Sequence, residues 1–160
     1  MSCHRKVSRW IRVSLTSCLG VFAVLCLLAP LGQGAEPLPA SNVTTVVIGG
    51  VEKGAAGPLL VYLYNSKESW LEPAKAFRQE VLKTSGKSEY RWTLKGLPTG
   101  NYAVQVVHDE DSNGALTMGF FGPSEGVGVS KYVPSFIPSF DKAKFQHRGQ
   151  ETMVRVEMNY

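Results

Sequence analysis

Residues 96–108 are Gly-Leu-Pro-Thr-Gly-Asn-Tyr-Ala-Val-Gln-Val-Val-His, a turn followed by an apolar run. Pro98 and Gly100 favour a chain reversal, because proline presets one backbone angle and glycine accepts angles that other residues avoid. In an extended chain from Tyr102 onwards, Tyr102, Val104 and Val106 lie on one face, and Ala103, Gln105 and Val107 lie on the other. The stretch therefore predicts a turn that leads into an apolar strand of a β protein.

Other segments have strand character as well. Leu59–Tyr64 is apolar on both faces, and the final segment alternates, with Val154, Val156 and Met158 on one side. The remaining predicted strands are Val43–Val51, Ser88–Leu94 and the segment after Gly126. The one helical candidate is Trp70–Lys83, whose apolar residues approximate a 3.6-residue period with Pro73 in the first turn. We expect an all-β fold, an antiparallel β-sandwich with at most one short helix near residues 73–83.

The N-terminal segment predicts export. Four basic residues lie within the first twelve, and an apolar run covers residues 13–31 before small residues that end at Ala35. This order is typical of a signal peptide. We expect a signal peptide at 1–35, a linker at 36–42 and one domain at 43–160, in a periplasmic or secreted protein with no membrane span after cleavage. An uncleaved membrane anchor and lipidation at Cys18 are the alternatives.

Charge and cysteine content exclude several classes of function. The chain has 17 Lys+Arg and 13 Asp+Glu, but four of the basic residues lie in residues 1–35, so the remainder is balanced. Nucleic-acid binding driven by bulk charge is therefore disfavoured. All three cysteines also lie in that segment. The expected domain thus has no disulfide framework, no cysteine-ligated zinc and no cysteine nucleophile.

An acidic loop follows the strand that ends at His108. Asp109, Asp111 and Asn113, followed by Gly114, match the first half of a calcium loop, in which oxygen ligands alternate along the chain. The second half of an EF-hand is missing, and Glu125 is the residue we expect to close the site. The alternative is an Asx-rich turn whose side chains accept hydrogen bonds from their own backbone.

Residues 122–126 match the Gly-x-Ser-x-Gly pattern of a hydrolase nucleophile, with Ser124 at its centre. Asp141 and His147 follow in the hydrolase order. A nucleophile elbow needs a strand before the serine and a helix after it, whereas Gly126 and the valines behind it predict a loop and a strand. We expect a glycine-rich surface loop. His108 is expected at a strand end with a hydrogen bond, and His147 at the surface.

The run from Gly96 to Gly114 resembles the bacterial domain-of-unknown-function family 2141, whose pattern has "LP-x-G-x-Y-A" followed by "H-D-x-[ND]-x-N-G". Residues 122–130 are similar to its glycine-rich segment, and residues 140–145 to its "F-x-x-A-x-F". The resemblance covers residues 43–160. It implies an exported protein with a transthyretin-like or prealbumin-like β-sandwich and no established activity. Thr117 stands where the family usually has an acid.

Together these features favour a binding or structural module over an enzyme. Loops 116–130 and 132–140 carry apolar aromatic residues and are the expected contact regions for a protein or small-molecule partner. Calcium is the expected cofactor, bound by Asp109, Asp111, Asn113 and Glu125. The alternatives are a small serine hydrolase that uses Ser124 with His108 or His147, and a carrier that binds an apolar small molecule through its aromatic residues.

Overall fold

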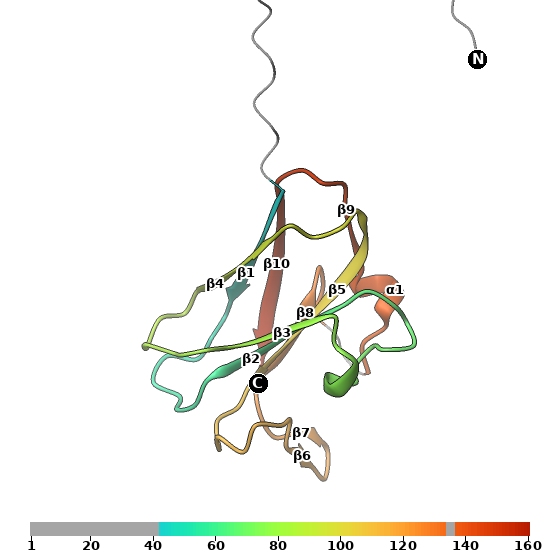
Figure 1. The fold of residues 1–160 in the computed structure, drawn as a ribbon. Coiled ribbons are helices and arrows are strands. Elements are labelled where there is room, and N and C mark those ends of the chain that lie inside the picture. The colour runs from blue at the N-terminus through green and yellow to red at the C-terminus, as the bar shows by residue number, and fades with distance from the viewer. Residues whose placement is uncertain (1–41, 134–136) are drawn as a thin grey trace, which may run out of the picture. The chain divides into compact units, whose positions relative to one another are not determined.

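The computed structural model describes residues 42–133 and 137–160, and almost all of its regular structure is β (Figure 1). The predicted signal peptide and all of the predicted linker except Asn42 lie outside these residues. The elements are β1 (Val43–Gly49), β2 (Leu59–Tyr64), the 3-10 helix η1 (Pro73–Lys75), β3 (Arg78–Leu82), β4 (Tyr90–Lys95), β5 (Gly100–His108), β6 (Met118–Gly119), β7 (Gly122–Pro123), β8 (Val127–Ser130), α1 (Phe140–Ala143), β9 (Phe145–His147) and β10 (Thr152–Asn159).

Eight of the strands form one sheet, in which seven follow the order β3-β2-β5-β8-β10-β1-β4 and β9 pairs with β5. The sheet curls until its edge strands approach each other, and the Trp92 indole N–H of β4 donates to a Glu80 carboxylate oxygen of β3 at 2.7 Å. The all-β prediction is confirmed. The expectation of purely antiparallel pairing is wrong at one ladder, because β1 runs parallel to β10.

The core lies on both faces of β2 and β5. Val104 and Val106 of β5 belong to the inner cluster, together with Val61 of β2, while Ala103 and Val107 pack on the outer face, near α1. Every residue of β2 is buried. This confirms the prediction that Leu59–Tyr64 is a central strand, since apolar side chains on both faces need cover on both sides. The apolar strand predicted after Tyr102 is β5, which is covered in the same way.

The prediction of at most one short helix near residues 73–83 is correct only in part: that region holds one 3-10 turn, and a second short helix, α1, lies at Phe140–Ala143. Pro73 begins a single 3-10 turn, as expected of a proline at a helix start, but Arg78–Leu82 is the edge strand β3. The Phe77 N–H donates to the Leu63 carbonyl at 2.8 Å and so begins the ladder with β2. Backbone hydrogen bonds to β2 therefore outweigh a weak helical pattern. In the described part of the chain, no helix has the length and apolarity needed to span a membrane.

Candidate functional site

The acidic loop connects β5 to β8 and carries the β6–β7 hairpin, which Figure 1 shows beyond the ends of those strands. Both ends of the loop are held by backbone hydrogen bonds. The His108 N–H donates to the Gly126 carbonyl at 2.8 Å, and the Asp109 N–H donates to the Pro58 carbonyl at 2.9 Å. The loop therefore begins and ends at two strands, β5 and β8, that pair with each other.

Three of the predicted ligands come together in this loop. Carboxylate oxygens of Asp109, Asp111 and Glu125 all lie within 4.8 Å of one another. Asp109 and Glu125 are buried, and Asp111 is exposed. None of the ion pairs in residues 42–133 and 137–160 involves these three residues or the neighbouring Glu110. Hard oxygen donors without a basic partner are the type of group that binds calcium.

The buried carboxylates accept hydrogen bonds from the backbone of the loop. The two oxygens of Asp109 accept the N–H groups of Asn113 and Gly114 at 3.0 and 2.9 Å. Those of Glu125 accept the N–H groups of Glu110 and Thr117 at 3.1 and 2.9 Å. These contacts compensate part of the buried charge. The Asx-turn geometry proposed as the alternative to calcium is therefore present, and the same oxygens make up the acidic cluster.

Asn113, the fourth predicted ligand, points its side chain into the loop itself. Its Oδ1 accepts the Ala115 N–H at 2.8 Å, and its Nδ2 donates to Asp111 Oδ2 at 2.9 Å and to the Thr117 hydroxyl at 2.7 Å. Asp111 also accepts the Thr117 hydroxyl and the Asn113 N–H. Desolvation acts to raise the pKa of Asp111, but these hydrogen bonds outweigh it and lower the pKa.

Gly57 supports the loop from the β1–β2 connection. Its φ is +92°, and a Cβ added there would collide with the Asp109 carbonyl oxygen and lie 2.9 Å from the Glu110 Cα. Only a glycine allows the two backbones to approach this closely. The position of Asp109 therefore depends on a residue more than fifty positions earlier, which no local motif indicates.

The hydrolase residues do not assemble. The Ser124 hydroxyl donates to the Thr117 carbonyl at 3.1 Å, and the next element is the strand β8 rather than a helix. His108 is buried at the end of β5, and its Nδ1 lies 2.8 Å from the Tyr160 hydroxyl. Among the described residues neither imidazole forms a hydrogen bond with Ser124.

The expected surface position of His147 is wrong, because its side chain is completely buried in β9. Its Nε2 lies 2.9 Å from Asn42 Oδ1, and its Nδ1 lies 3.1 and 3.0 Å from the hydroxyls of Thr44 and Thr152. The Asn42 Nδ2 donates to the Leu97 carbonyl, so Oδ1 is the acceptor and His147 Nε2 carries the proton. The imidazole joins β9 to the start of β1 through polar contacts.

An apolar groove of about 610 Å³ lies beside the acidic loop. Glu125 belongs to both the groove and the acidic cluster. The other residues that line it are mostly apolar: Leu71, Leu116, Met118, Phe121, Pro123, Val127, Val129, Ile137, Pro138 and Tyr160, together with Gln105, Gly122, Gly128 and Asn159. Tyr64, Trp92 and Tyr102 do not line this groove, because they are buried in the core.

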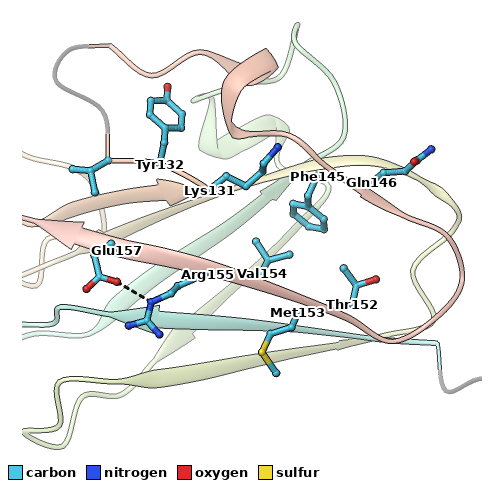
Figure 2. Close-up of a pocket in the computed structure, with 10 residues that line it drawn as sticks. Lys131, Tyr132, Phe145, Gln146, Thr152, Met153, Val154, Arg155 and Glu157 are labelled. Atoms are coloured by element: carbon cyan, nitrogen blue, oxygen red, sulfur yellow. Dashed lines mark hydrogen bonds and ion pairs between the residues drawn. The ribbon is translucent and has the colours of Figure 1, made fainter.

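A second groove, also of about 610 Å³, lies between β10 and two short stretches, residues 131–133 and 145–146 (Figure 2). Phe145 and Val154 are its buried apolar residues, and Met153 is 68 % exposed. Arg155 and Glu157 form an ion pair of 3.1 Å at one end. This groove lies away from the acidic cluster and shares no lining residue with the first groove.

Comparison with known protein families identifies a match over most of the domain. The model of a family described as an uncharacterized protein conserved in bacteria (DUF2141) matches residues 46–155, which confirms the resemblance seen in the sequence motifs. No curated protein and no solved structure matches the chain.

Proposed function

Because the chain belongs to the DUF2141 family of uncharacterized proteins conserved in bacteria, we propose a function from the site alone: an exported, non-catalytic domain that binds an apolar ligand or partner segment. The proposal rests on the first groove, where a volume of about 610 Å³ is lined mainly by apolar side chains. Grooves of this size and composition are typical of sites for small apolar molecules.

Calcium has a specific role in this proposal. An ion held by Asp109, Asp111 and Glu125 would stiffen the loop that forms one wall of the groove, since Glu125 belongs to both. Both oxygens of Asp109 and the Oε2 of Glu125 accept one N–H group each, so each keeps a second lone pair for an ion. Exposed Asp111 leaves room for water ligands. This donor set fits a hard cation that takes six to eight oxygens.

The groove is tested with an apolar fluorescent dye and with native mass spectrometry of the purified protein. We expect blue-shifted dye emission and a co-purified apolar molecule, both lost in Leu116→Asp. Met153→Asp is the matched control, because it places the same charge in the second groove. Equal loss of dye binding in the two variants, or no binding by the parent protein, would refute the proposal.

For the fold, we propose the transthyretin-like sandwich that the family resemblance implies. In this description the β2–β5 part of the curled sheet faces the β10–β1–β4 part across the inner core, which takes side chains from both. An experimental structure would test it. Export is tested separately by the mature N-terminus, which we expect at Glu36.

A further inference from the structure

Two aromatic side chains stand almost fully in solvent at the tip of the β6–β7 hairpin. Phe120 is 94 % exposed and Phe121 is 99 % exposed. The ladder of the hairpin consists of Met118 opposite Pro123 and Gly119 opposite Gly122, so the two phenylalanines form the connection between the strands. The two rings contact each other edge to face, with their centroids 5.0 Å apart. Adjacent large apolar side chains that are exposed in this way are typical of interaction sites.

We propose that this tip docks on a lipid bilayer, with Phe120 and Phe121 inserted at the membrane surface. The shape of the feature favours a bilayer over a folded partner. A rigid partner would need a pocket matched to two projecting rings, whereas a bilayer interface deforms around any convex apolar tip and accepts aromatic side chains well. The proposal concerns the tip and does not depend on a ligand in the groove.

The charge distribution supports the same occupant. Residues 115–124 contain no charged side chain, so the tip can leave water without desolvating a charge. Acidic residues begin at the base of the loop, with Asp111 on one side and Glu125 on the other. These acids lack a basic partner among the described residues, so in the absence of a bound cation they would repel anionic lipids. The structure therefore points to a zwitterionic surface.

Backbone polarity limits the depth of insertion. Only two residue pairs form the hairpin ladder, and the peptide groups at the tip have no strand beside them. Unpaired peptide groups are not tolerated in the hydrocarbon core, where water cannot hydrogen-bond them. The rings should therefore stop among the headgroups and the first methylene groups of the acyl chains.

The test places a tryptophan at the tip. The Phe120→Trp variant is expressed as the full chain and purified after whatever N-terminal processing the cell carries out. It is then mixed with phosphatidylcholine vesicles that carry bromine either near the headgroup or deep in the acyl chain. Tryptophan in the parent protein supplies the background. We expect a blue shift and strong quenching by shallow bromine, with weak quenching by deep bromine. Phe120→Ser should lower the vesicle partition coefficient roughly tenfold.

Met153→Trp is the matched control, because Met153 is 68 % exposed and lies in the second groove. Met153 is near the start of β10, whereas Asn159 at the end of β10 lines the first groove, beside the acidic loop. A tryptophan there should not be quenched. If a retained N-terminal segment binds vesicles by itself, the quenching still reports only on the position of the tip. An unquenched tip or equal quenching at both positions would overturn the proposal. So would binding that requires anionic lipid when chelator is present. So would a dimer that Phe120→Ser dissociates, without vesicle binding by the parent protein.

Discussion

Replacing Gly57 by alanine should destabilise the protein far more than the same change at Gly54, although both glycines lie in the β1–β2 connection. Their φ angles are nearly equal, +92° and +90°. A Cβ at Gly54 would have no atom within 4 Å, whereas one at Gly57 would collide with the backbone of Asp109. The pair therefore separates backbone strain from the close approach that holds the acidic loop.

The expected magnitudes follow from these contacts. A positive φ costs an alanine about 1–2 kcal/mol at either position, and the smaller entropy of the unfolded chain offsets part of this cost equally in both variants. Gly57→Ala must in addition displace the Asp109 carbonyl, whose carbon would lie 2.7 Å from the new Cβ. Overpacking against rigid backbone costs about 1–3 kcal/mol, and weakening the Asp109–Pro58 hydrogen bond adds about 1 kcal/mol. The gap between the variants should therefore be about 2–4 kcal/mol.

Urea unfolding followed by tryptophan fluorescence measures this gap, since Trp92 is buried in the core. At about 4 °C per kcal/mol for a domain of about 120 residues, the melting temperatures should differ by roughly 8 °C or more. The slopes of the urea transitions should agree, because the variants expose the same surface on unfolding. Unfolding free energies within about 0.5 kcal/mol of each other would refute the close contact between Gly57 and Asp109.

Three further results are expected. His147→Leu should cost about 2–3 kcal/mol of unfolding free energy, because it leaves the buried Thr44 hydroxyl without a partner. His108→Leu should be nearly neutral, because the buried His108 Nε2 has no hydrogen-bond partner among the described residues. Equal losses in urea unfolding would contradict this. Excess calcium should raise the melting temperature of the parent protein by several degrees and should not change the melting temperature of Asp111→Asn. Coincident melting curves for the parent protein with calcium and with chelator would count against a cation site. Because the pKa of Asp111 is lowered by folding, its carboxylate stabilises the protein at pH values above its unfolded-state pKa of about 4. This stabilisation is lost as the pH falls through the folded-state pKa. The unfolding free energy of Asp111→Asn, measured by urea unfolding across this range, should therefore depend less on pH than that of the parent protein.

Strands that are buried on one or two faces could be predicted from the sequence. In β10, Val154, Val156 and Met158 are buried and Met153 is exposed, as the alternation indicates. Such patterns are local, because successive side chains of a strand point to opposite faces. The edge strand β3 has no such pattern. Its residues Arg78–Val81 are exposed, so burial imposes no alternation on them, and only pairing with β2 determines their conformation.

The acidic loop shows the same division within one site. Alternate oxygen-bearing residues from Asp109 to Asn113 indicate a tight turn, because such side chains hydrogen-bond their own backbone. Pattern alone proposed Glu125 as the closing residue, and the Asn113 side chain, which bonds within the loop, could not be placed in advance. After the β6–β7 hairpin the chain comes back to Asp109, and this brings Glu125 beside it. That placement depends on the pairing of β5 with β8, which lies outside the loop.

By itself, the sequence determined the central strand β2, the apolar strand β5, the acidic turn and the absence of cysteine chemistry after residue 35, since each depends on residue type and short-range periodicity. Only the tertiary structure decided the parallel β1–β10 pair, the edge strand β3, the burial of His147 and the contact of Gly57 with Asp109. His147 and Asn42 are 105 residues apart and form a hydrogen bond of 2.9 Å. Contacts at such separations arise from the curl of the whole sheet, which no local pattern encodes.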